Sequence, residues 1–326
     1  MLPLGIVIPT KNSMAYLPRH VEGLRPWLDL VEQIVVVDSF SNDGTLDFLQ
    51  RNLSHPRVTY TTHPPGLYAS WNHGIAQVRS RHVYISTVGD TITRAGLEML
   101  VHTAEALDCD VVVSKPYFCD ANGRFLPDIL WPVDDIIATL GGTAPRKLHK
   151  LEAVIFAAVH ATGALTGSCA SCVFRTATLQ RFPFPTEFGG AGDGAWGVVH
   201  AAEVNWGIVA QKISTFLMHP PDPSSMHRQP LNHVCRMDGL LCEAAQRWQR
   251  EGVMSPAALE AIGWKRLTQM LANYLALKSR LNEQRHGAFP WIMNPFAWLI
   301  RTRRALISMQ LRHIQRRALA AALLVK

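Results

Sequence analysis

Short apolar runs that end in polar signatures constrain the fold of this chain more than any other feature. Residues 5–8 and 34–37 are β-branched runs of the kind that form strands buried on both faces of a sheet. Between them, over residues 13–30, apolar residues recur at helical spacing. This order predicts a βαβ unit, in which two parallel strands are joined by a right-handed helical crossover.

The same alternation continues along the chain. Further strands are expected at residues 58–60, 83–86, 111–113, 171–175 and 207–210. Helices are expected at residues 68–79 and 97–107, and another after the Gly-rich segment, ending at about residue 202. Residues 117–165 lack a clear alternation, and we interpret them as an excursion over the sheet. The sequence therefore predicts an α/β fold, a mostly parallel sheet flanked by helices, followed by a helical C-terminal region from residue 231.

Length and composition fit two units. The chain has 326 residues, 48% of them hydrophobic, which suffices for one large core and an appended region, and we place the boundary after residue 225. Six cysteines are too few for a disulfide scaffold, and no leader precedes the first strand, so a cytoplasmic chain is expected. Cys169 and Cys172 have the Cys-x-x-Cys spacing of a redox pair or of half a zinc site. No second pair is spaced to complete four zinc ligands, so we expect these cysteines to pack in the core.

The positive charge is concentrated at the C-terminal end. From Arg285 to Lys326 there are eight Lys or Arg and no acidic residue, and aromatic anchors such as Trp291 and Trp298 precede most of them. This composition suits an interfacial helix on an anionic membrane surface, and equally a basic helix packed on the body or on a dimer partner. The aromatics do not interleave with the bases as nucleic-acid binding requires, and no apolar run is long enough to span a membrane.

Carboxylates stand at the carboxyl ends of the predicted strands. Asp38 ends the second strand, and Asp90 follows a later one. Ligands of open α/β sheets bind outside those strand ends, and an unpaired carboxylate there is costly to bury. Asp38 is therefore predicted to contact a ligand, whereas helix capping explains Asp43 and Thr45.

Four signatures follow one another in the first 90 residues. They are Gly5-Ile6-Val7-Ile8-Pro9-Thr10-Lys11-Asn12, Ile34-Val35-Val36-Val37-Asp38-Ser39-Phe40-Ser41-Asn42-Asp43-Gly44-Thr45, Gly66-Leu67-Tyr68-Ala69-Ser70-Trp71-Asn72-His73-Gly74-Ile75-Ala76 and Tyr84-Ile85-Ser86-Thr87-Val88-Gly89-Asp90. Their order resembles that of family 2 glycosyltransferases of the GT-A fold. A dinucleotide-dependent oxidoreductase would instead need a Gly-x-Gly-x-x-Gly loop after the first strand.

The resemblance implies a GT-A domain with a Rossmann-like sheet over residues 1–225 and a helical region over 226–326. It also implies inverting transfer of a sugar from a nucleotide-diphosphate sugar, most naturally a UDP-sugar, to an acceptor hydroxyl. The nucleotide contacts that it implies are Pro9, Thr10, Asn12, Asp38 and Asn72.

A divalent metal is the expected cofactor, Mg²⁺ or Mn²⁺, because the diphosphate leaving group develops charge and hard cations take carboxylate oxygens. By resemblance Asp90 holds the metal or the ribose, but Val88 occupies the position of the first carboxylate in the usual Asp-x-Asp motif. Asp90 could instead cap the helix that begins near Arg94. His219 is the second candidate ligand, against a structural histidine.

An inverting transfer also needs a base to take the proton of the acceptor hydroxyl. Asp193 lies in a Gly-rich turn that opens a helix and resembles the late acidic motif of the family; its alternative role is an N-cap. Glu187 is the reserve candidate. Trp196 could offer an apolar face to a sugar ring or pack in the core.

The setting that the family suggests is the synthesis of surface polysaccharide or glycan. We therefore expect a glycan or lipid-linked acceptor and a cytoplasmic protein that associates with the membrane surface through its basic tail. One rival stays open, a non-catalytic relic of the same fold that binds a sugar nucleotide or a partner, because loss of one metal carboxylate is what decay would produce. Turnover distinguishes the two.

Overall fold

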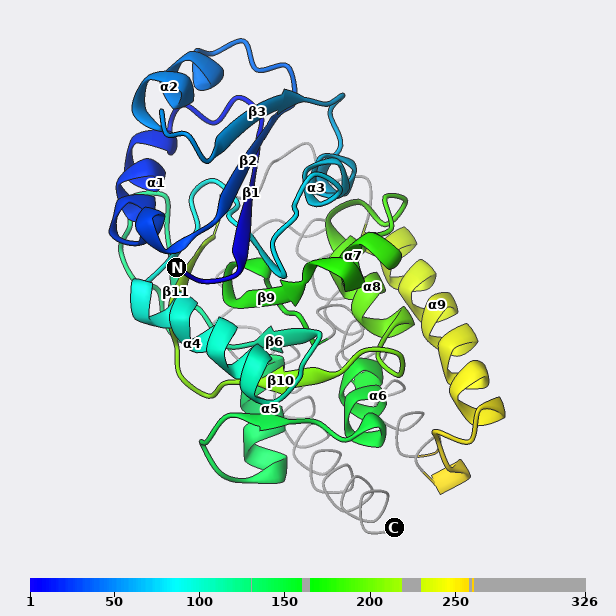
Figure 1. Ribbon diagram of the computed structural model, residues 1–326. Coiled ribbons are helices and arrows are strands. Elements are labelled where there is room, and N and C mark those ends of the chain that lie inside the picture. Colours follow the sequence, from blue (N-terminus) through cyan, green and yellow to red (C-terminus); the bar gives the residue numbers. More distant parts are fainter. Residues whose placement is uncertain (130, 160–164, 219–229, 258–259, 261–326) are drawn as a thin grey trace, which may run out of the picture. The chain divides into compact units, whose positions relative to one another are not determined.

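The computed structural model describes residues 1–129, 131–159, 165–218, 230–257 and 260 (Figure 1). The chain divides into two compact units, Met1–Ala244 and Ala245–Lys326. The predicted boundary after residue 225, His219 and the basic tail all lie outside the described residues. No helix in the described ranges is long and apolar enough to cross a membrane.

An eight-stranded sheet forms the centre of the first unit (Figure 1). Its strands, in order across the sheet, are β3 (Val58–Thr62), β2 (Gln33–Asp38), β1 (Leu4–Thr10), β4 (His82–Ile85), β9 (Cys172–Arg175), β6 (Val111–Val113), β10 (Trp206–Ile208) and β8 (Arg146–Lys147). Only β9 and β8 run antiparallel to their neighbours in this sheet. The predicted mostly parallel α/β sheet is confirmed.

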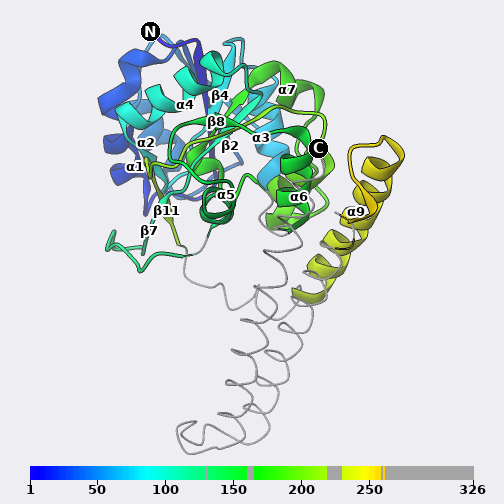
Figure 2. The ribbon, with the colours of Figure 1, turned by 90° about the horizontal axis from the view of Figure 1, so that it is seen from below.

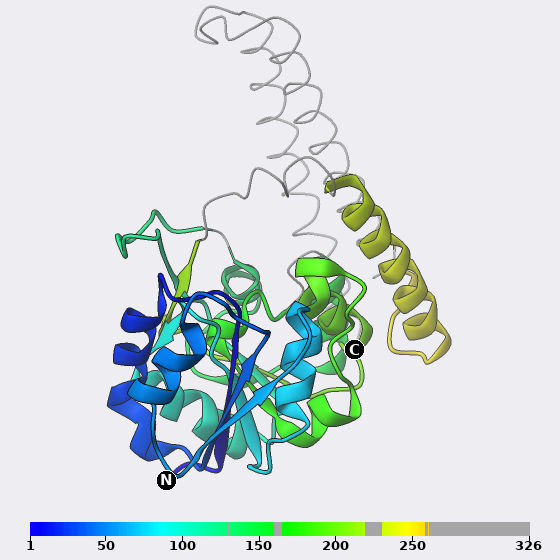
Figure 3. The ribbon, with the colours of Figure 1, turned by 90° about the horizontal axis from the view of Figure 1, so that it is seen from above.

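Helices cover both faces of this sheet (Figures 2 and 3). On one face lie α1 (Leu17–Leu24), the 3₁₀ helix η1 (Arg25–Leu30), α2 (Thr45–Asn52) and α4 (Arg94–Ala106). On the other lie α3 (Leu67–Ile75), α6 (Lys150–Val159), α7 (Thr176–Arg181) and α8 (Gly192–Val199). Every residue of β1 is buried, as a strand covered on both faces requires.

Alternation along the strands divides the side chains between the two faces. Ile6 and Ile8 belong to the core beneath α1, α2 and α4. Val7 points the other way and meets α3 at Gly74, where an added Cβ would lie 2.5 Å from a Val7 methyl and 2.9 Å from a Val37 methyl. The missing side chain therefore lets α3 lie directly on β1 and β2.

The segment 117–165, predicted as an irregular excursion, has more structure than expected. It holds β7 (Tyr117–Cys119), α5 (Pro132–Leu140), β8 and α6. β7 pairs with β11 (Ser214–Leu217), which also pairs with β5 (Thr91–Ile92) in a separate three-stranded sheet. The remaining elements are η2 (Cys169–Ser171), η3 (Gly189–Ala191) and α9 (Pro230–Arg250). β7, β8 and β11 have only 3, 2 and 4 residues, too few for a period to show in the sequence.

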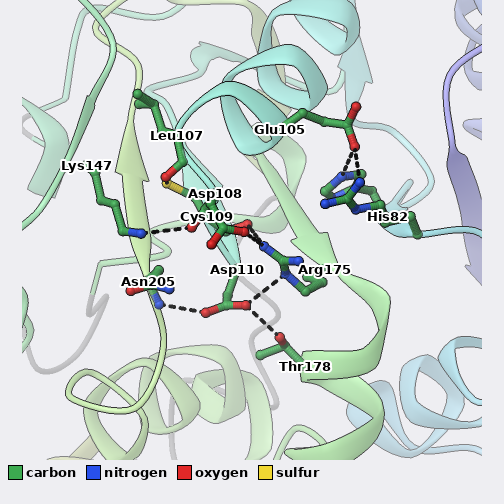
Figure 4. Close-up of polar contacts among 11 residues, drawn as sticks. His82, Glu105, Leu107, Asp108, Cys109, Asp110, Lys147, Arg175, Thr178 and Asn205 are labelled. Carbon is green, nitrogen blue, oxygen red and sulfur yellow. Dashed lines mark hydrogen bonds and ion pairs between the residues drawn. The ribbon is translucent and has the colours of Figure 1, made fainter.

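A polar network closes the amino-terminal edge of the parallel strands (Figure 4). Because β9 is antiparallel, its last residue, Arg175, meets the residues that precede β6, and its guanidinium lies 2.5 Å from Asp108 Oδ1 and 2.9 Å from Asp110 Oδ1. Asp110 Oδ2 accepts a hydrogen bond from the Asn205 N–H at 2.8 Å, and Thr178 Oγ1 donates to Asp110 Oδ1. This edge of the sheet is thus occupied by the protein's own groups.

The Cys169 and Cys172 thiols are free and buried. The Cys172 Sγ–H points to the carbonyls of Thr166 and Ser168 at 3.2 and 3.0 Å, and burial raises the pKa of both thiols well above its ordinary value. Neutral thiols of this kind behave as small apolar groups, so the predicted core packing is confirmed.

The contact of α3 with the sheet yields a stability prediction. Gly74→Ala should lower the free energy of unfolding by about 1–3 kcal/mol, because its Cβ would overlap the Val7 and Val37 methyls. Gly239→Ala is the matched control: it is also a helical glycine, nothing lies within 4 Å of its added Cβ, and it should gain up to about 1 kcal/mol. Urea unfolding measures both, and equal effects would contradict the close approach.

Candidate functional site

A cleft of about 390 Å³ opens at the carboxyl ends of β1 and β4, the edge opposite the network at Arg175. The loops after β1, β2 and β4 converge there because parallel strands bring their carboxyl ends to one edge. The start of α3 completes the wall. The lining residues are Pro9, Thr10, Lys11, Asn12, Ser13, Tyr16, Ser39, Gly66, Leu67, Ser70, Thr87 and Val88.

Two buried oxygens at this cleft have no hydrogen-bond partner among the described residues. Thr10 and Asp38 are register partners at the ends of β1 and β2, and Asp38 is 1% exposed. Asp38 Oδ2 accepts a hydrogen bond from the Ser41 N–H at 2.9 Å, whereas Asp38 Oδ1 and Thr10 Oγ1 are unpaired. Burying such atoms unpaired costs about 1–3 kcal/mol each. Asp38 does not itself line the cleft, but its neighbours Thr10 and Ser39 do.

Hydrogen bonds between the loops after β1 and β2 hold this part of the cleft in place. Asn12, whose φ is +45°, accepts the Asn42 N–H at 3.0 Å through Oδ1 and donates its own N–H to Ser41 Oγ at 2.9 Å. The Ser13 N–H donates to Thr45 Oγ1 at 2.8 Å. Thus Pro9, Thr10 and Asn12 line one prearranged wall, and their nucleotide contacts stay predictions.

Asn72 lies elsewhere. Its amide donates to the Phe184 carbonyl at 2.8 Å and accepts the Phe184 N–H at 3.0 Å, so both ends are used by one backbone position. It does not line the cleft. The resemblance implied a nucleotide contact for Asn72 because it lies in the motif Gly66–Ala76, whose first residues do line the cleft. Further along the helix, the Asn72 side chain instead holds the loop before α8.

Asp90 is buried and is held by the small sheet. Its Oδ1 accepts the Leu217 N–H of β11 at 2.8 Å, and its carbonyl accepts a hydrogen bond from His20 Nδ1 at 3.1 Å. His20 Nδ1 must carry the proton, so Nε2 accepts from Ser86 Oγ at 3.3 Å. Burial raises the pKa of Asp90 from 3.8 to about 7, partly offset by the Leu217 hydrogen bond, and lowers the pKa of His20 to about 4.

The described residues do not by themselves fit a divalent metal. No group of three or more His, Cys, Asp or Glu converges in the described ranges, and Val88 lines the cleft where the first carboxylate of the usual motif would stand. A cation of this class takes several oxygen ligands. Asp90 is tied to Leu217, two residues before His219, but His219 itself lies outside the described residues.

Asp193 lies in the first turn of α8. Its Oδ1 accepts hydrogen bonds from the Tyr68 hydroxyl at 2.9 Å and from the Gly194 N–H at 2.8 Å. Burial raises the pKa of Asp193, and these two hydrogen bonds oppose the rise. A carboxylate with a raised pKa is better matched to taking a proton near neutral pH, as a general base must. It is not an N-cap: Ala191 is the N-cap residue of α8.

The two predicted sugar or acceptor contacts lie in different surroundings. Trp196 is 0% exposed, donates its Nε1–H to the Phe182 carbonyl at 2.6 Å and packs against Phe174 and Trp206. The prediction of a sugar platform is therefore wrong for Trp196, because no face of its ring reaches solvent. Glu187 is exposed in the loop before η3, and its role stays a prediction.

Sequence reasoning missed Ser39, Ser70 and Tyr68. Ser39 Oγ and Ser70 Oγ lie 2.9 Å apart and both residues line the cleft, while Tyr68 contacts Asp193. A signal for the last two existed, since the glycine before them starts a helix at the carboxyl-end edge of the sheet. His20 gave none, because the chain has fourteen histidines and α1 lies far in sequence from Asp90.

Comparisons with known proteins agree with this geometry. Residues 5–161 match the family model for Glycosyl transferase family 2, and the search of curated proteins gave no match. S. aureus TarS 1-349 in complex with UDP aligns with a TM-score of 0.51 and 19% identity over 75% of this chain and 71% of that chain. Its complex with UDP-GlcNAc aligns with a TM-score of 0.53 and 17% identity over 75% and 72%. The predicted GT-A-like fold is confirmed, and the match over residues 5–161 agrees with the predicted family.

The buried carboxyl of Asp90 predicts a pH-dependent stability. Its folded pKa lies above its unfolded value, so the unfolded chain releases the proton first and stability falls as pH rises from about 4 to about 7. Asp90→Asn keeps an acceptor for Leu217 without the ionisation. With a chelator present, wild type should lose about 4 kcal/mol relative to this variant between pH 4 and pH 8. Urea unfolding at both pH values checks it; parallel changes would contradict it.

Proposed function

We propose that the chain is a glycosyl transferase of family 2, whose model matches residues 5–161. In this proposal it transfers a sugar from a nucleotide-diphosphate sugar to an acceptor hydroxyl, with inversion at the anomeric carbon. The observation that carries the proposal is that Asp38 Oδ1 and Thr10 Oγ1, on register partners at the ends of β2 and β1, are buried without a partner among the described residues, and that Thr10 lines the cleft. The fold shared with TarS, which was crystallised with UDP and UDP-GlcNAc, supports a UDP-sugar as the donor.

The cleft has the groups that a nucleoside diphosphate needs. Asp38 Oδ1 would accept an N–H of the base or a hydroxyl of the ribose, which satisfies a buried acceptor that is otherwise unpaired. Among the lining residues Lys11 alone carries a charge, and its ammonium, 3.5 Å from the Ser39 carbonyl, suits an anionic diphosphate. In this proposal Asp38 complements the hydrogen-bond donors of the nucleoside, and Lys11 complements the charge of the diphosphate.

The chemical step needs only one proton acceptor from the chain. The acceptor oxygen attacks the anomeric carbon, the bond from that carbon to the diphosphate oxygen breaks, and the nucleoside diphosphate leaves with the bonding electrons. The hydroxyl proton passes to the Asp193 carboxylate. The hydrogen bonds from the Tyr68 hydroxyl and the Gly194 N–H both fall on Oδ1, and we propose Oδ2 as the atom that takes the proton.

A divalent metal enters the proposal only through Asp90 and His219. When bound, such a cation neutralises charge on the diphosphate oxygens. Because Asp90 is the single carboxylate at this point and His219 lies outside the described residues, no step above is routed through a metal.

The proposed acceptor is a glycan or a lipid-linked sugar, and the proposed setting is surface polysaccharide synthesis at the cytoplasmic face of a membrane. The basic residues from Arg285 to Lys326 support contact with an anionic surface or with a second copy of the chain.

Nucleotide binding by Asp38 can be tested directly. Asp38→Asn should weaken UDP binding by about tenfold or more, because the amide replaces a charged acceptor and presents N–H groups of its own. Asp47→Asn, an exposed aspartate of α2, is the matched control and should bind UDP like wild type. Isothermal titration calorimetry gives both affinities, and equal values for the two variants would remove Asp38 from the nucleotide site.

The role of Asp193 predicts a split between binding and turnover. Asp193→Asn should lower the transfer rate by about a hundredfold or more, because the amide cannot accept the proton, and leave UDP affinity near that of wild type. Nucleotide release from a panel of nucleotide sugars, with and without Mn²⁺, measures the rate. Glu187→Gln tests the reserve base: loss of activity there, with an active Asp193→Asn enzyme, would transfer the role to Glu187.

The same panel separates an enzyme from a non-catalytic relic of the fold. A chain that binds UDP-sugars but releases no nucleotide with any acceptor would sink the transferase proposal and leave a binding protein.

A further inference from the structure

Tyr68 connects the proposed base to the proposed donor cleft. It lies in the first turn of α3, between Leu67 and Ser70, which line the cleft, yet its own side chain turns the other way and is 3% exposed. Its hydroxyl has two acceptors within reach, Asp193 Oδ1 at 2.9 Å and the Gly190 carbonyl at 3.1 Å. The nearer acceptor is also the charged one, and charged acceptors form the stronger hydrogen bonds.

The ring of Tyr68 is fixed by its surroundings. Trp71 meets it edge-on with ring centroids 4.9 Å apart, and Phe184 lies at 5.6 Å. The backbone of Phe184 is itself clamped by the Asn72 amide. On the remaining side an added Cβ at Gly192 would lie 2.5 Å from two Tyr68 ring carbons, so α8 can begin here only because this residue has no side chain.

We infer that Tyr68 is a positioning residue for Asp193: it orients the carboxylate and holds it ionised while the same turn of α3 forms the wall of the donor cleft. This inference rests on the proposed function, in which Asp193 is the base. It follows from the geometry that one helix turn sets the position of the proton acceptor relative to the donor. A base and a donor held by one rigid element keep the alignment that an in-line displacement needs.

The titration of Asp193 should report this hydrogen bond. Burial raises the pKa of Asp193, and the Tyr68 hydroxyl opposes that rise by donating to the ionised form. Among the residues that the structure describes, the other titratable groups that interact with Asp193 are the Cys169 and Cys172 thiols, which burial keeps protonated. Burial and the nearby carboxylate also raise the pKa of Tyr68 itself, so it stays a donor throughout the neutral range.

The test is Tyr68→Phe, which keeps the ring and removes the hydroxyl. We expect kcat to fall about tenfold or more, the acid limb of the kcat profile to move to higher pH, and UDP affinity to stay within about twofold of wild type. Titration of the ¹³C-labelled Asp193 carboxyl, identified by its loss in Asp193→Asn, should show the same upward movement without any need for turnover.

Tyr84→Phe is the matched control. It removes another buried tyrosine hydroxyl, one that donates to the Ala170 carbonyl at 3.0 Å, so it loses a comparable hydrogen bond. The pH profile of kcat and the titration of the Asp193 carboxyl should both stay as in wild type. If Tyr68→Phe does not fold, the Cζ resonance of ¹³C-labelled Tyr68 in wild type should move with the Asp193 titration, because the hydroxyl donates to that carboxylate. A Tyr68 resonance that stays constant through the Asp193 titration would overturn the role of Tyr68.

The outcomes separate the two proposals. An active wild-type enzyme, with an Asp193 titration and a pH profile that Tyr68→Phe leaves unchanged, overturns the role of Tyr68 alone. A wild-type chain that transfers no sugar overturns the proposed function, and with it any catalytic role for Tyr68. A shift of equal size in Tyr84→Phe would mean that the effect is a general loosening of the core, and it too would overturn the role of Tyr68.

Discussion

The seating of α3 on the sheet is the constraint on which the rest of the site depends. Gly74 lets the helix axis approach β1 and β2 so closely that methyl groups of Val7 and Val37 occupy the space of its missing side chain. The helix therefore begins directly above the carboxyl ends of those strands, where Leu67 and Ser70 become cleft wall. A bulkier residue at this one position would lift the helix and with it the wall.

Both edges of the sheet bury polar groups, but only one of them borders the cleft. At the amino-terminal edge, Arg175 and Asp110 pair with each other and with neighbouring groups. At the carboxyl-end edge, Thr10 Oγ1 and Asp38 Oδ1 are buried without a partner among the described residues. Buried polar atoms in folded proteins are nearly always paired, so a ligand in the cleft that Thr10 lines would satisfy the second pair of oxygens. At the opposite edge His82 Nδ1 and Thr176 Oγ1 are also unpaired within the described ranges, but neither residue lines this cleft.

The sequence predicted the elements of the sheet and their order along the chain well, because the strands of the first 113 residues are short apolar runs separated by helical patterns. Of these strands, β1, β2 and β3 are neighbours both in sequence and in space. It could not predict that β9 would enter the sheet antiparallel between β4 and β6, since a run of four residues carries no direction. For the same reason the pairing of β7 with β11, about a hundred residues apart, left no local trace.

Among the site residues, the position of a residue at a strand end was easier to predict from the sequence than the contacts of a side chain on a helix. Asp38 could be placed at a strand end from the alternation alone. Asn72 and Trp196 lie on helices, where one residue more or less turns the side chain by about 100° from cleft to core. Their partners, the Phe184 backbone and the Phe182 carbonyl, belong to a loop more than a hundred residues after Asn72, and no spacing in the sequence reports that contact.

Asp90 is buried without a second carboxylate beside it, and this environment determines at which pH it is ionised. With Val88 in place of a second carboxylate, only the Leu217 N–H offsets the burial of Asp90, and the carboxyl titrates near pH 7. A cation binds the ionised form, so its affinity at this point would fall as pH drops through that value. A neutral Asp90, by contrast, still accepts the Leu217 N–H and keeps β11 against the loop after β4. Asp90 thus keeps its hydrogen bond to β11 in both protonation states, whereas it binds a cation only when it is ionised. Recognition of the donor therefore depends more on Asp38, Thr10 and the charge of Lys11.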